Sequence, residues 1–103
     1  MSIRKASIVF ILLLVTACSG FIMDGLRKEY YPNGKLQSEI NYRQAIREGM
    51  CRLYYENGQL KEEGSYRNGQ REGTWKKYYE SSRLKSEETY MQGNLIDTKT
   101  YRE

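Results

Sequence analysis

Tyr54-Tyr-Glu-Asn-Gly-Gln-Leu-Lys-Glu-Glu-Gly-Ser-Tyr-Arg-Asn-Gly-Gln-Arg-Glu-Gly-Thr-Trp-Lys-Lys77 is the stretch of sequence that determines the fold. Its tyrosine pair, Tyr54-Tyr55, occurs again 24 residues earlier and 24 residues later. A leucine, a glutamate and a further tyrosine recur at the same spacing. The recurring residues are Tyr30-Tyr31, Tyr54-Tyr55 and Tyr78-Tyr79; Leu36, Leu60 and Leu84; Glu39, Glu63 and Glu87; and Tyr42, Tyr66 and Tyr90. Nine of the ten tyrosines therefore occupy three positions of a 24-residue repeat.

Each repeat carries two turn signals between short runs of strand-forming residues. In the clearest copy these signals are Asn57-Gly58 and Asn68-Gly69, and Asn-Gly is the favoured centre of a type I′ hairpin turn. Two turns in each copy leave strands of roughly six to eight residues, whereas helix-pair repeats need about 33 residues or more. The sequence predicts an all-β fold, a single-layer antiparallel meander of about six strands that are added two at a time.

The repeat also predicts where the sheet has its core. Aromatic residues at a fixed spacing should form rows across the strands, and Cys51 shares its repeat position with Trp75, so both are expected in one buried row. An unpaired Cys51 thiol could instead cross-link two copies in an oxidising compartment. The first copy has Gln44-Ala45 in place of Asn68-Gly69, which predicts a non-standard turn.

These residues resemble the bacterial variant of the MORN repeat. The pattern is Tyr-Tyr-x-Asn-Gly-x-Leu-x-x-Glu followed by Tyr-x-Asn-Gly-x-x-x-Gly-x-Trp, and it covers residues 24–103 in about three copies. The resemblance implies a sheet of hairpin repeats and a role in binding. Proteins of this variant are often described as YwqK-type antitoxins, and other MORN proteins are scaffolds or are linked to membrane lipids.

The N-terminus differs from the repeats. Arg4 and Lys5 precede an apolar stretch over residues 6–17, and Val15-Thr16-Ala17-Cys18 resembles the lipobox of bacterial lipoproteins. The prediction is a helical signal peptide over residues 1–17, cleavage between Ala17 and Cys18, and lipid attachment to the Cys18 thiol. Residues 18–23 would then be a short tether before the repeat domain at 24–103.

Two other interpretations of this segment remain open. An uncleaved span from Ala6 to Met23 would reach only about 27 Å as a helix, less than the roughly 30 Å of a bilayer core. An ordinary secretory signal would leave Cys18 incidental. The lipoprotein interpretation places the protein in a bacterial cell envelope. The expected site is the periplasmic face of the outer membrane if the host has two membranes, and otherwise the outer face of the cell membrane.

Composition argues against several classes of function. The chain has no histidine, which removes the commonest general base and metal ligand, and it has no glycine-rich phosphate loop. Its 17 basic residues are interspersed with 13 acidic ones, so no basic patch for nucleic acid is visible. We expect no enzymatic activity, metal, cofactor, small-molecule substrate or nucleic acid. The row Glu39, Glu63 and Glu87 is interpreted as a solvated, charge-paired face.

The prediction for function is a binding module that is anchored in the membrane through Cys18 and docks a protein partner, such as a toxin in an antitoxin-like or immunity-like role. Tyrosine, tryptophan and arginine are enriched at interface hot spots. The candidate partner-binding residues are Tyr55, Tyr66, Arg67, Arg71, Trp75 and Tyr79. The alternatives are a structural scaffold whose sheet edges pair between copies, and direct recognition of lipid headgroups.

Overall fold

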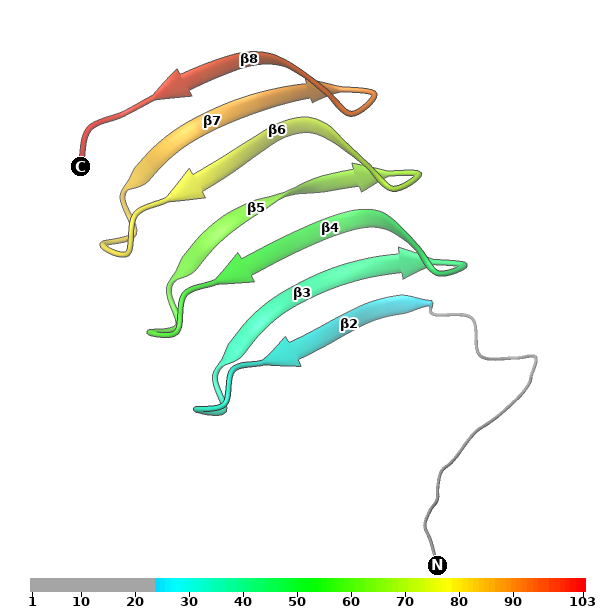
Figure 1. The fold of residues 1–103 in the computed structure, drawn as a ribbon, viewed down its shortest axis with the longest axis horizontal. Coiled ribbons are helices and arrows are strands. Elements are labelled where there is room, and N and C mark those ends of the chain that lie inside the picture. Colours follow the sequence, from blue (N-terminus) through cyan, green and yellow to red (C-terminus); the bar gives the residue numbers. More distant parts are fainter. Residues whose placement is uncertain (1–23) are drawn as a thin grey trace, which may run out of the picture.

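A computed structural model describes residues 24–103 of the chain. They form one antiparallel sheet in which every strand pairs with the next along the sequence, as Figure 1 shows. The strands are β2 Gly25–Tyr30, β3 Leu36–Arg43, β4 Ile46–Tyr54, β5 Leu60–Arg67, β6 Gln70–Tyr78, β7 Leu84–Met91 and β8 Asn94–Thr100. The predicted all-β meander is confirmed, with seven strands in the described range rather than about six. The half-repeat before Tyr30 adds β2.

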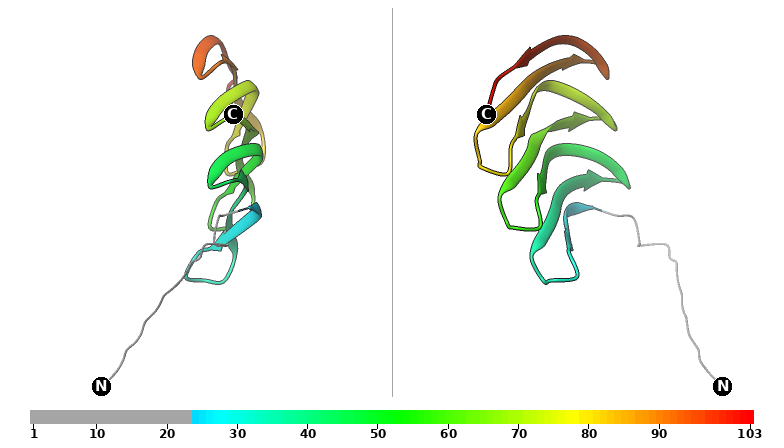
Figure 2. Two further views of the ribbon diagram at one scale, coloured as in Figure 1. Left: turned by 90° about the vertical axis from the view of Figure 1, so that its right-hand side faces the viewer. Right: turned by 60° about the vertical axis from the view of Figure 1, so that its left-hand side comes forward.

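The sheet is a single layer whose strands bend into arcs (Figure 2). The bend lies around Gly49 in β4 and Gly73 in β6, where three residues of the bent strand lie opposite one residue of its partner. Gly49 and Gly73 adopt φ of 91° and 74° there, a conformation that glycine takes at little cost. The Glu48-Gly49 and Glu72-Gly73 pairs are therefore bend signals.

Two different kinds of turn alternate along the sheet. Asn68-Gly69 has positive φ at both residues and closes a two-residue hairpin, as predicted for a type I′ turn. Gln44-Ala45 has the same geometry, with φ of 51° and 68°, so the expectation of a non-standard turn there is wrong. Because Asp24 Oδ1 accepts a hydrogen bond from the Gln44 amide at 2.8 Å, the side chain before β2 supports this turn.

The prediction of a type I′ turn at Asn57-Gly58 is also wrong. Only Gly58 has positive φ in this turn, and the loop spans the longer distance from Tyr54 to Leu60. Asn57 Oδ1 accepts a hydrogen bond from the Gln59 amide at 2.8 Å, so the asparagine stabilises the loop through its side chain.

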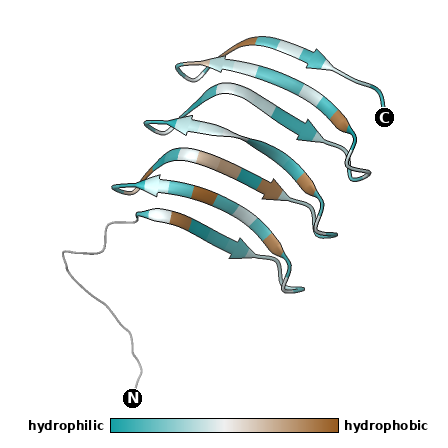
Figure 3. Cartoon of the chain, turned by 180° about the vertical axis from the view of Figure 1, so that it is seen from behind, coloured by the Kyte–Doolittle hydropathy of each residue, from teal (hydrophilic) through white to brown (hydrophobic). Residues whose placement is uncertain are grey.

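Few side chains are fully buried. Trp75 is 0% exposed and Cys51 is 2% exposed, and they form the apolar core of the described residues, as the shared repeat position predicted. Figure 3 shows that apolar residues are scattered over the strands while most of the sheet is hydrophilic. A sheet with so small a core must be held together by contacts between neighbouring repeats.

The predicted helical signal peptide, the cleavage after Ala17, lipid attachment at Cys18 and the tether over 18–23 fall outside the described residues. Within residues 24–103 there is no helix of the length and hydropathy that a membrane span needs.

Candidate functional site: two faces of a repeat sheet

Side chains alternate between the two faces of a strand, and one face of this sheet is organised by charge. The strand registers place seven residues in one row across the sheet. In order they are Lys28, Glu39, Arg52, Glu63, Lys76, Glu87 and Lys99, with strictly alternating sign. We call this side the charge face. Lys28–Glu39 and Arg52–Glu63 are ion pairs at 3.8 and 3.6 Å.

Tyrosine hydroxyls bind the carboxylates of this row. Tyr54 donates to Glu39 at 2.6 Å and Tyr78 donates to Glu63 at 2.8 Å. Burial raises the pKa of Tyr78 to about 12, with a smaller contribution from the hydrogen bond to Glu63. The glutamates are thus engaged in structure, and the interpretation of a charge-paired face holds, although the Glu39 side chain is only 13% exposed and is less solvated than expected.

Tyr101 completes this series at the end of the sheet. It follows Tyr78 at one residue less than the repeat spacing, and its hydroxyl still donates to Glu87 at 2.7 Å. Tyr101 was not predicted from the sequence, because it departs from the 24-residue spacing of the other tyrosines. A search that allowed one deletion would have found it.

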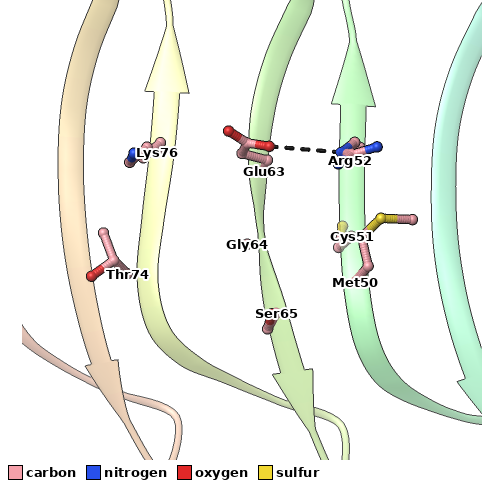
Figure 4. A pocket seen from close by; sticks show the side chains of 8 residues that line it. All are labelled: Met50, Cys51, Arg52, Glu63, Gly64, Ser65, Thr74 and Lys76. Atoms are coloured by element: carbon pink, nitrogen blue, oxygen red, sulfur yellow. Dashed lines mark ion pairs between the residues drawn. The ribbon is translucent and has the colours of Figure 1, made fainter.

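The charge face contains a shallow hollow of about 220 Å³ between β4, β5 and β6. Figure 4 shows its side chains: Met50 and Arg52 stand on one side of Gly64, and Thr74 and Lys76 stand on the other. Arg52 is paired with Glu63 across it. No group of three or more acidic or sulfur ligands that could hold a metal ion occurs among residues 24–103.

The opposite side, the tryptophan face, is organised by aromatic rings and arginines. The Trp75 indole lies over Gly64, where an added Cβ would come within 2.2 Å of a ring carbon. Its Nε1 donates to the Ser65 carbonyl at 3.0 Å, and the Tyr66 ring packs edge-on at 5.1 Å. The Arg71 guanidinium covers the indole at 4.0 Å.

Arg71 is the charged centre of this cluster. Its Nη1 lies 2.9 Å from Oε2 of Glu62, a carboxylate that is only 8% exposed, and 3.4 Å from the Tyr90 hydroxyl. Burial alone lowers the pKa of Arg71, but Glu62 and the hydroxyls of Tyr66 and Tyr90 outweigh it and keep the pKa raised. The arginine is therefore a permanent cation that is already neutralised within the sheet.

The candidate partner-binding residues are placed as follows. Tyr66, Arg71 and Trp75 come together in the tryptophan-face cluster, and the buried Trp75 offers no surface to a partner. Tyr55 and Tyr79 lie apart from it, and each donates its hydroxyl to a carbonyl further along the chain, that of Tyr78 or Tyr101.

Arg67 is exposed beside the Asn68-Gly69 turn and lines a separate hollow with residues of β6. Contact of Tyr55, Arg67 or Tyr79 with a partner stays a prediction.

Cys51 is a free, buried thiol. Burial, with a smaller contribution from Glu62, raises its pKa to about 11. At pH 8 only about one thiol in a thousand would be the reactive thiolate.

We expect Cys51, in a chain with Cys18→Ser, to resist a thiol-specific reagent at pH 8 for hours and to react within minutes in denaturant. Rapid native labelling, measured by intact mass, would show that the thiol is accessible.

Comparison with known proteins gives one family. The model of the MORN repeat variant matches residues 23–44, 47–68 and 71–92. These three matches cover well over half of the chain, and they recur with the period of the structural repeat. The curated proteins contain no significant match, and neither do the solved structures.

Proposed function

The chain belongs to the MORN repeat variant family, and from this premise we propose that it is a lipid-anchored envelope protein whose sheet binds a protein partner. MORN repeats in general are modules that bind proteins or membranes rather than enzymes. The observation that carries the proposal is the extent of the sheet: nearly every described residue lies in the repeats, and both faces present ordered polar side chains.

Two features support a protein partner over a lipid surface. The alternating signs of the charge face leave no large cationic patch of the kind that anionic headgroups attract. Arginine and tyrosine side chains on the tryptophan face are held in fixed positions, so a partner would not have to order them on binding. An antitoxin-like or immunity-like role is the specific form of this proposal.

The lipid anchor rests on the sequence Val15-Thr16-Ala17-Cys18. Since β2 begins at Gly25, only a few residues would separate an acylated Cys18 from the first strand. Two or more acyl chains hold a protein on a bilayer far more firmly than one. The repeat sheet would then stand close to the membrane, with its later strands further out.

The anchor has a direct test. The protein extracted from membranes should have the mass of residues 18–103 plus a diacylglyceryl group, with or without a third acyl chain. Cys18→Ser should abolish the lipid mass. An intact mass that matches the whole unprocessed chain would exclude processing and would favour the uncleaved span.

A second candidate function is a scaffold that assembles through its own edges. Among residues 24–103 no strand pairs with the outer edge of β2 or of β8, and large apolar side chains are exposed on both strands. They are Leu26 and Tyr30 on β2 and Leu95 and Ile96 on β8. Open edges can pair between molecules.

Sedimentation of the Cys18→Ser chain in mild detergent distinguishes the two functions. The binding-module proposal expects a monomer with and without reductant. Oligomers that persist in reductant would favour the scaffold.

A further inference from the structure

Residues that are 24 positions apart occupy equivalent places in neighbouring repeats, so the two repeats can be compared residue by residue. Arg71, Glu62 and Trp75 correspond in this way to Arg47, Ser38 and Cys51. In the second repeat, residues 54–77, the Arg71 guanidinium lies 4.0 Å from the Trp75 ring and 2.9 Å from the Glu62 carboxylate. The chain supplies both partners itself.

The first repeat, residues 30–53, provides Arg47 with neither an indole nor a carboxylate at the equivalent positions. Cys51 is far smaller than tryptophan, and Ser38 has a hydroxyl where Glu62 has a carboxylate. Arg47 keeps contact with the Tyr66 ring at 5.3 Å, and the neighbouring Tyr42 side chain is the main cause of its raised pKa. Within residues 24–103 no carboxylate forms an ion pair with Arg47, which is exposed.

A hollow of about 240 Å³ opens at this place. Its lining residues are Arg27, Glu29, Ser38, Ile40, Tyr42 and Arg47, from β2, β3 and the start of β4. Ile40 takes the place of Gly64 and makes one wall apolar. Glu29 forms an ion pair with Arg27 at 3.1 Å and none with Arg47.

We propose that this first-repeat hollow binds a peptide of the protein partner that brings an aromatic side chain and a carboxylate together. The carboxylate pairs with Arg47, as Glu62 does with Arg71. Ser38 and Tyr42 line the same hollow, and their hydroxyls can donate to a carboxylate. The ring packs on Ile40 and against the guanidinium, as Trp75 does in the next repeat. This inference rests on the proposed function and names the chemistry of the partner's contact.

The smallest probe with this chemistry is N-acetyl-tryptophan, and its matched control is N-acetyl-tryptophanamide, which lacks only the charge. The measurement is a titration of the isotope-labelled full chain with Cys18→Ser in detergent micelles, followed by NMR. The acid should shift the Ile40 methyl and Arg47 Nε signals with a Kd on the order of 0.1–1 mM, as expected for so small a ligand. The amide should bind about tenfold or more weakly.

Three variants assign the binding to this hollow. Arg47→Gln should weaken it about tenfold or more, and Lys76→Gln, on the charge face, should leave it unchanged. Ser38→Glu installs the second repeat's own carboxylate, so it should also abolish binding of the acid. Circular dichroism would confirm that each variant keeps the sheet, and Arg47→Gln, at an exposed position, decides the matter if Ser38→Glu unfolds.

Equal affinity for the acid and the amide, no shift at millimolar probe, or full binding to Arg47→Gln would each overturn the inference. Such a failure leaves the proposed function standing if a partner still contacts the protein in cells. If no partner contacts the protein and the probe still binds, the proposed function fails, and the hollow is a small-ligand site rather than a peptide site.

Discussion

Replacing Trp75 by alanine should lower the free energy of unfolding by about 3–5 kcal/mol, the range for truncation of a buried tryptophan. A domain of about 80 residues has roughly 4–12 kcal/mol in total, so this single change would remove much of the stability. Trp75 is the only fully buried large side chain among residues 24–103, and Tyr66, Arg71 and the Ser65 carbonyl all contact it.

Urea unfolding followed by circular dichroism measures the loss. The matched control is Tyr30→Ala, which removes a largely exposed aromatic side chain from β2 and should cost less than about 1 kcal/mol. Equal losses for the two variants would show that the sheet is not centred on Trp75.

Gly64→Ile should be at least as damaging, and its damage should be reversible by a second change. Any Cβ at Gly64 would meet the Trp75 ring within 2.2 Å, so the larger side chain must expel the indole, and we expect little folded protein. The first repeat has Ile40 and Cys51 at these two positions and packs them in register. Adding Trp75→Cys to Gly64→Ile copies that arrangement into the second repeat.

The double variant should therefore be more stable than Gly64→Ile by about 2 kcal/mol or more, a coupling typical of residues in direct contact. Thermal unfolding of the wild-type chain, both single variants and the double variant gives the four stabilities of a double-mutant cycle. Additive losses would contradict the claim that the two positions form one packing unit.

The fold could be predicted because the sequence repeats it. A fixed period with two turn signals per copy leaves little choice but hairpins, and the Cys51–Trp75 correspondence located the core. The prediction for the turn at Asn57-Gly58 was wrong because a dipeptide does not reveal the length of its loop. The pairing of Tyr54 with Leu60 sets that length. The prediction for the Gln44-Ala45 turn was wrong because the pairing of β3 with β4 on either side of it forces positive φ on two residues that do not favour it.

The site was less predictable than the fold. Tyrosine and arginine at repeated positions suggested a binding surface, but Arg71 proved to be neutralised by Glu62, a pairing that depends on cross-strand distance rather than on sequence spacing. The hollow beside Arg47 is a difference between two copies: serine replaces glutamate and cysteine replaces tryptophan. A repeat alignment contains those differences, and only the three-dimensional structure shows that they border the same hollow.

The most direct test of a membrane-anchored sheet that binds a partner is photo-cross-linking in intact cells. A photoreactive amino acid is placed at exposed Arg27, which lines the first-repeat hollow, and, as the control, at exposed Lys76 on the charge face. We expect one discrete adduct with a different protein in the membrane fraction from position 27, which Arg47→Gln weakens. Adducts only between copies of this chain, or none from either position, would contradict it.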